Sequence, residues 1–122
     1  MERLPSPPRL RIRIVFGDAE MLGPGKAELL EHIDRTGSIA AAGREMGMSY
    51  KRAWQLIRAL NAMFQTPVVT SLRGGAGGGG AVLTPMGRDV LRLYRGFETE
   101  AARAGASQLD AFRALLNAPG AK

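Results

Sequence analysis

The chain has 122 residues, 45% of them hydrophobic, which suits one domain with one core. Its formal net charge of +6 favours a polyanionic partner, nucleic acid above all. Cysteine is absent, which excludes disulfides, thiolate-bound metals and thiol catalysis, and the lone His32 leaves almost no room for a histidine metal site or triad.

The first predicted element is a strand over Arg9–Phe16, after a proline-rich arm over residues 1–8. Apolar and basic residues alternate strictly here, as in a half-buried strand. We expect one face to be buried and to carry Leu10, Ile12, Ile14 and Phe16. The arginines of the other face are either solvated or directed at phosphates: Arg9, Arg11 and Arg13.

Three helices follow a turn-rich segment over 17–25. The first is predicted over 24–36, with Pro24 in its first turn and Gly37 after its end. Ser38 is a good cap for a short, alanine-rich helix over 39–46. Ser49 is a good cap for a third helix over 50–64, whose apolar stripe has helical spacing.

Two strands, over 68–73 and 81–83, enclose a glycine-rich tip over 74–80. Thr84 and Pro85 then begin a long helix, whose apolar residues lie close to a heptad seam. A short helix is expected to follow Gly105, and a disordered tail over 117–122. The fold class is therefore mainly α with a small β wing, a winged helix-turn-helix with a long C-terminal dimerisation helix.

The second and third helices carry the pattern of a helix-turn-helix. Ala42 and Gly43 are small where the helices would cross, and Gly47 suits the sharp turn. The third helix would then enter the major groove of DNA. No acidic residue occurs between Met46 and Gly87, as expected of a surface that faces phosphates. The candidate DNA-binding side chains of this helix are Ser49, Tyr50, Lys51, Arg52, Gln55 and Arg58.

The glycine-rich tip has two open interpretations. It is either a plain flexible hairpin or a DNA wing, whose bare backbone amides would meet phosphates. We favour the wing, with Arg73 at its base and Gly77 and Gly78 at the contact. Trp54 is expected to pack at the edge of the core and to brace the third helix against the first.

These segments resemble a known family. The run Gly37-Ser38-Ile39, the run from Gly47 to Trp54 and the glycine-rich segment ending at Thr84 are similar to the N-terminal domain of the ModE family of molybdate-responsive regulators, a LysR-type winged helix-turn-helix. The resemblance implies that Ser49, Tyr50 and Lys51 face DNA and that residues 74–80 form the wing. It also implies a homodimer formed through the helix at 85–104.

The chain departs from the family in two respects. Ala76 lies where the wing commonly carries a lysine, so one phosphate contact is in doubt. Full-length members continue into C-terminal domains that sense molybdate, and this sequence ends at Lys122. We therefore expect no molybdate or tungstate binding, no cofactor and no metal. Control would be constitutive or would come from a separate signal-sensing partner.

The sequence thus predicts a transcriptional regulator that binds specific double-stranded DNA sequences, with metal-oxyanion transport genes as expected targets. The alternative is a winged-helix protein-interaction module without specific DNA binding. We expect no enzyme, because no nucleophile–base pair or paired-carboxylate spacing is present. We also expect no membrane segment, since no apolar run approaches about 18 residues, and a cytoplasmic location. The expected divisions are an arm (1–8), a winged domain (9–84), a dimerisation helix with a C-terminal helix (85–116) and a tail (117–122).

Overall fold

In this computed structural model of the chain, residues 8–72 and 80–117 are described. The predicted arm lies outside the described residues except for Pro8, the glycine-rich tip except for Gly80, and the tail except for Asn117. The elements in chain order are β1 (Ile14–Val15), β2 (Met21–Leu22), α1 (Pro24–Thr36), α2 (Ile39–Glu45), α3 (Tyr50–Met63), β3 (Val69–Ser71), β4 (Ala81–Leu83), α4 (Pro85–Ala104) and α5 (Ala106–Leu115).

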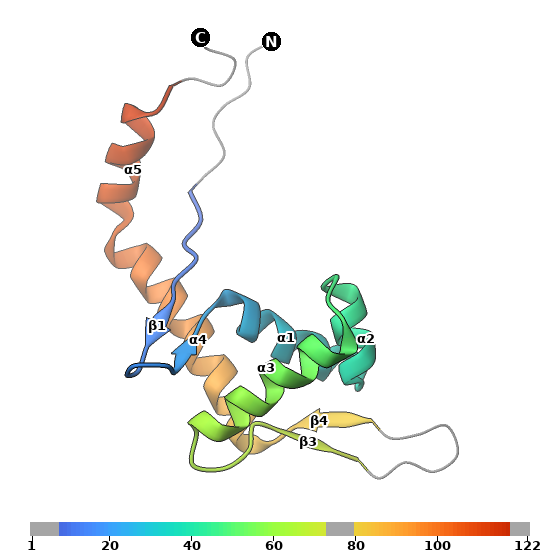
Figure 1. Ribbon diagram of the computed structural model, residues 1–122. Coiled ribbons are helices and arrows are strands. Elements are labelled where there is room, and N and C mark those ends of the chain that lie inside the picture. The colour runs from blue at the N-terminus through green and yellow to red at the C-terminus, as the bar shows by residue number, and fades with distance from the viewer. Residues whose placement is uncertain (1–7, 73–79, 118–122) are drawn as a thin grey trace.

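Helix α1 lies at the centre of the core. Its side chains Leu29, Leu30 and Ile33 have no exposed surface, because α2, α3, α4 and β4 all pack around this helix. Figure 1 shows α4 passing along one side of the domain beside β1 and β2, while α2 and the β3–β4 hairpin lie toward the other side. The predicted winged helix-turn-helix is confirmed.

The helices begin where their caps predict. The Ser38 side chain accepts a hydrogen bond from Ala41 N, the Ser49 side chain from Arg52 N, and the Thr84 side chain from Gly87 N. Strands β3 and β4 pair antiparallel, with Val69 opposite Leu83, so the predicted hairpin is also confirmed.

The predicted strand over Arg9–Phe16 is mostly wrong. Only Ile14 and Val15 form a strand, paired with Leu22 and Met21 of β2, which lies within the segment expected to be turns alone. Strand β1 is short because its partner β2 consists of only two residues, after which the chain reaches Gly23 and Pro24. Phe16 is also not buried, since it follows the paired residues and is 50% exposed. Leu10, Ile12 and Ile14 are partly buried, as the alternation predicts.

The apolar seam of α4 divides into two parts. Val90 is buried in the core of its own domain and Met86 packs partly against it, whereas Leu93 is 63% exposed and Phe97 is 49% exposed. Tyr94 was not among the predicted core residues, yet it is buried, and its hydroxyl donates a 2.5 Å hydrogen bond to the backbone oxygen of Ile12. Helix α5 has no buried residue and extends beyond α4 (Figure 1).

Candidate nucleic-acid interface

Helices α2 and α3 meet at a tight turn that depends on two glycines, Gly47 in the turn itself and Gly43 where the helices cross. Gly47 has φ of 72°, in the left-handed region that glycine adopts readily. The backbone N–H of Met48 donates to the Gly43 oxygen over 2.9 Å and closes the turn. A Cβ added at Gly43 would lie 3.3 Å from the Cβ of Ala53, so a larger residue would force the two helices apart. The small residues predicted for a helix-turn-helix therefore allow this close crossing.

Helix α3 presents its polar face to solvent. Ala53, Ile57 and Leu60 are buried on the inner side of the helix. The predicted DNA-binding residues of this segment are all exposed, namely Ser49, Tyr50, Lys51, Arg52, Gln55 and Arg58. The Ser49 oxygen already accepts from Arg52 N over 3.0 Å, which leaves its hydroxyl proton available to a phosphate.

The positive charges of α3 have no acidic partner. Within residues 8–72 and 80–117, Lys51, Arg52 and Arg58 form no ion pair. Arginines on the other side of the domain do pair, such as Arg88 with Asp34 over 3.1 Å and Arg95 with Glu31 over 2.8 Å. The Glu31 hydrogen bonds raise the pKa of Arg95 further above its ordinary value. Glu31 and Asp34 of α1 thus neutralise arginines of α4, whereas the surface of α3 stays positive.

Asn61 joins the end of α3 to the wing. Its side-chain oxygen accepts from Val68 N over 2.8 Å and from Val69 N over 3.1 Å, and its amide nitrogen donates to the Val69 oxygen over 3.2 Å. The role of Asn61 was not predicted from the sequence. An asparagine near the end of a helix and shortly before a strand is only a weak signal, since many such residues are solvated.

The predicted wing residues Arg73, Gly77 and Gly78 lie outside the described part of the chain. At the base of the hairpin, Leu72 N donates to the Gly80 oxygen over 2.7 Å, and Ala81 N donates to the Gly37 oxygen over 2.9 Å. The latter bond fastens β4 to the turn between α1 and α2. The wing therefore leaves the domain from a fixed base beside the helix-turn-helix.

Trp54 is partly buried against the core, as expected. It lines a hollow of about 200 Å³ together with residues from the start of α2, from β3 and from the base of the wing. The Tyr50 ring meets it edge-on, with centroids 6.3 Å apart. At this hollow Trp54 lies beside the start of α2 and the base of the wing. That it also braces α3 against α1 stays a prediction.

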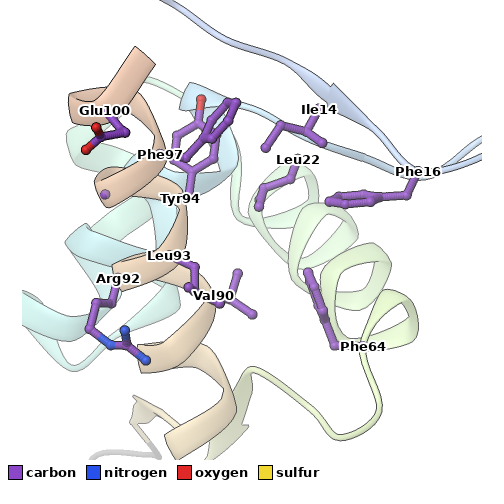
Figure 2. Close-up of a pocket in the computed structure, with 11 residues that line it drawn as sticks. Ile14, Phe16, Leu22, Phe64, Val90, Arg92, Leu93, Tyr94, Phe97 and Glu100 are labelled. Carbon is purple, nitrogen blue, oxygen red and sulfur yellow. The ribbon is translucent and has the colours of Figure 1, made fainter. Parts of the chain in front are cut away.

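A second hollow lies on α4 and has an apolar wall. Its volume is about 800 Å³, and Figure 2 shows Leu93, Phe97, Tyr94 and Val90 of α4 on one side of it. Phe64, from the end of α3, and the side chains of the N-terminal hairpin lie opposite, namely Ile14, Phe16 and Leu22 (Figure 2). Burial, together with the nearby Glu98, raises the pKa of Tyr94, so its phenol stays protonated over the ordinary pH range. We call this hollow the α4 groove.

No group of three or more metal-ligating side chains occurs in the described ranges. The same ranges contain no helix with the length and apolar character needed to cross a bilayer.

Comparison with known proteins shows which family this chain resembles. A family model described as bacterial regulatory helix-turn-helix protein, lysR family, matches residues 25–88. A solved structure described as the CbnR DBD–DNA complex is similar with a TM-score of 0.55 at 22% sequence identity, over 71% of this chain and 94% of that chain. At that identity the likeness supports the fold alone.

Curated relatives match the chain at higher identity. The molybdenum-pterin-binding protein MopB of Rhodobacter capsulatus is 45% identical over 79% of this chain and 34% of its own length. The DNA-binding transcriptional dual regulator ModE of Escherichia coli K12 is 42% identical over 58% of this chain and 27% of its own length. The molybdenum transport protein ModE of Azotobacter vinelandii is 40% identical over 65% of this chain and 29% of its own length. This chain therefore spans about a third of the length of the relatives that it matches.

Proposed function

Because the chain belongs to the lysR family of bacterial regulatory helix-turn-helix proteins, we propose that it binds specific double-stranded DNA sequences and regulates transcription from them. One observation carries this proposal. The exposed face of α3 holds Lys51, Arg52 and Arg58 without an acidic partner among the described residues. Cations left unpaired on a helix-turn-helix match the charge of a phosphate backbone.

In this proposal, α3 enters the major groove and side chains of its exposed face contact base edges. Lys51 or Arg58 would donate to guanine O6 and N7, and Gln55 would recognise adenine through N6 and N7. The hydroxyls of Ser49 and Tyr50 would bind phosphates and fix the register of the helix. The base contacts supply specificity, and the phosphate contacts supply the affinity that depends on salt.

The wing contributes on the flank of α3 to which Trp54 turns. Arg73 and the backbone amides of Gly77 and Gly78 would contact phosphates beside the major groove. These residues lie outside the described ranges, so their role rests on the sequence pattern and on the position of the hairpin base.

A second copy of this chain is the proposed occupant of the α4 groove. Phe16, Leu93 and Phe97 are each about half exposed or more, and clustered apolar side chains of this size mark an interaction surface. In the proposed division of the chain, 9–84 binds DNA and 85–116 supplies the dimerisation helix, whose groove is completed by apolar residues of 9–84. A two-fold dimer would bind two half-sites about one helical turn of DNA, or a multiple of it, apart.

The molybdenum-related names of the relatives support genes of metal-oxyanion transport as proposed targets. A separate signal-sensing partner, and a cytoplasmic location where the DNA would be accessible, belong to the same proposal.

Titration of a fluorescently labelled duplex of random sequence tests the first step. We expect anisotropy to rise at micromolar protein and the apparent Kd to increase steeply with salt. A winged-helix module that only contacts other proteins would give no salt-dependent binding in this range, and that outcome would contradict the proposal. The Lys51→Ala, Arg58→Ala double variant serves as the matched loss-of-charge control on α3 and should bind more weakly with a shallower salt slope.

A further inference from the structure

A basic cleft lies on the flank of α3 opposite the wing. Its volume is about 260 Å³, and its charged residues come from three parts of the chain: Arg13 precedes β1, Lys26 is in the first turn of α1, and Arg52 is in α3. Met48 and Leu56 form an apolar part of its wall. We call this hollow the hairpin cleft.

The position of the cleft follows from the geometry of α3. Tyr50 and Trp54 line the hollow beside the wing, whereas Arg52 and Leu56 line the hairpin cleft. Residues two apart in an α-helix point to nearly opposite sides, because a turn takes about 3.6 residues. Lys51 and Gln55 lie between the two flanks on the exposed side. The face proposed to enter the major groove is therefore bordered on one side by the wing and on the other by the hairpin cleft.

The cleft holds positive charge without a counter-ion. No carboxylate lines it, and within the described part of the chain Arg13 and Arg52 form no ion pair. The ammonium of Lys26 donates to the backbone oxygen of Met21 over 2.6 Å, which leaves two of its three protons free. By contrast Arg11, two residues before Arg13, pairs with Glu28 over 3.4 Å.

The electrostatics of Lys26 agree with that geometry. Burial lowers the pKa of Lys26, and the positive charge of Arg52 lowers it further. Desolvation and a neighbouring positive charge both disfavour the charged form of a lysine. An anion that binds beside such a lysine stabilises the charged form. Among the described residues, cations are also the only charged side chains that line the cleft, and a phosphate accepts hydrogen bonds from such donors at any DNA sequence.

We propose that the hairpin cleft binds a backbone phosphate of the DNA, on the side of α3 away from the wing, through Arg13, Lys26 and Arg52. This inference rests on the proposed function, since α3 must lie on DNA for the phosphate to reach the cleft. DNA is the source that the position favours, because Arg52 belongs both to the cleft and to the exposed surface of α3. The contact would fix the register of the helix and would carry no sequence preference.

The test compares Arg13→Gln with the wild-type chain on a selected duplex and on a random duplex, at several salt concentrations. We expect Kd to rise by the same factor on both duplexes, about five- to tenfold at 0.1 M salt, and the salt slope to fall by about one. Arg13→Lys should retain most of the affinity because it keeps the charge. Arg103→Gln removes the same charge from the far end of α4 and should leave both the affinity and the slope unchanged.

Three results would overturn the inference. The first is an affinity and a salt slope for Arg13→Gln equal to those of Arg103→Gln. The second is a loss confined to the selected duplex, which would make Arg13 a reader of bases. The third is saturable binding of inorganic phosphate or molybdate to the chain without DNA that Arg13→Gln abolishes, which would make the cleft a small-anion site.

Failure of the proposed function gives a different result. In that case the wild-type chain itself would not discriminate the selected duplex from the random one, or would bind neither. Equal melting temperatures of the Arg13→Gln variant and the wild-type chain exclude a folding defect as the cause of any loss.

Discussion

The side-chain oxygen of Asn61 accepts a 2.8 Å hydrogen bond from the backbone N–H of Val68, and this bond ties the end of α3 to the strand that leads into the wing. The same side chain also bonds both backbone polar groups of Val69. Because Val68 and Val69 are buried, water cannot replace these bonds. Helix α3 and the base of the wing therefore form one rigid unit.

Asn61→Ala should destabilise the domain by about 1–3 kcal/mol, since it leaves buried backbone groups unsatisfied. Urea unfolding followed by circular dichroism measures this free energy. Gln55→Ala is the matched control, because Gln55 is an exposed residue of the same helix, and it should change the free energy of unfolding by less than about 0.5 kcal/mol. Equal midpoints for the two variants would show that the Asn61 bonds contribute nothing.

Helix α4 lies close to the backbone of Val68, just before β3, at Gly87. A Cβ added there would lie 2.1 Å from the backbone oxygen of Val68, so the two segments would have to move apart. Gly87→Ala should therefore cost about 1–3 kcal/mol of stability. Gly25→Ala, in the first turn of α1, meets no atom within 4 Å and should be neutral or slightly stabilising. A Gly87→Ala variant as stable as the wild-type chain would contradict this packing.

Lys51→Ala should weaken binding to a specific duplex by about 1–3 kcal/mol if Lys51 contacts a base, with a smaller effect on random DNA. If Lys51 contacts phosphate only, affinity should fall evenly on all sequences and the salt slope should become shallower. Competition gel shifts with specific and random duplexes separate these outcomes. Unchanged affinity on both duplexes would remove Lys51 from the interface.

The sequence predicts the helices and the β3–β4 hairpin well because their signals are local. Ser38, Ser49 and Thr84 are caps, Gly47 supplies the left-handed turn, and each predicts a boundary within one or two residues of its own position. The exposure of Lys51 and its neighbours also follows from the stripe of apolar residues on α3.

The contacts that depend on distant parts of the chain could not be predicted. Alternation over 9–16 predicts an extended segment, but pairing also needs a partner, and β2 has only two residues. Tyr94 was missed because its hydroxyl partner, the Ile12 oxygen, lies 82 residues away. The hairpin cleft brings together Arg13, Lys26 and Arg52, which no local pattern links. The tertiary fold decides which charged side chains from different elements come together.

Phe97→Glu should convert the proposed dimer to a monomer, because it puts a charge into the apolar α4 groove. The melting temperature of the monomer should change little, as Phe97 is 49% exposed. Sedimentation velocity at micromolar protein measures the mass. Thr99→Glu adds the same charge on the same helix outside the groove and should leave the mass unchanged. A wild-type chain that sediments as a monomer would exclude this mode of dimerisation.

A cluster of charged side chains holds the end of α2 to α1. The participation of His32 in this cluster was not predicted from the sequence. Glu45 pairs with Arg35, and its Oε1 lies 2.6 Å from His32 Nδ1. The hydrogen bond from Arg35, followed by that from His32, lowers the pKa of Glu45 below its ordinary 4.5. The stabilisation is therefore fully present above about pH 4.5 and is lost as pH falls through the lower pKa of the folded state.

Glu45→Gln should accordingly melt at a lower temperature than the wild-type chain at pH 7, and this difference should shrink as the pH falls below 4.5. Thermal unfolding of both proteins across that range measures it. Glu100→Gln, in an exposed pair within α4, should show a much smaller difference at pH 7. A Glu45→Gln difference that is independent of pH would rule out the carboxylate as its cause.

Selection of bound duplexes from a random pool, carried out at two salt concentrations, tests the central claim most directly. A recognition helix that reads bases should enrich one sequence, or two related half-sites, and the same sequence should emerge at both salt concentrations while overall affinity falls at the higher one. A pool that stays random at both concentrations, with binding that disappears as salt rises, would contradict specific recognition by α3.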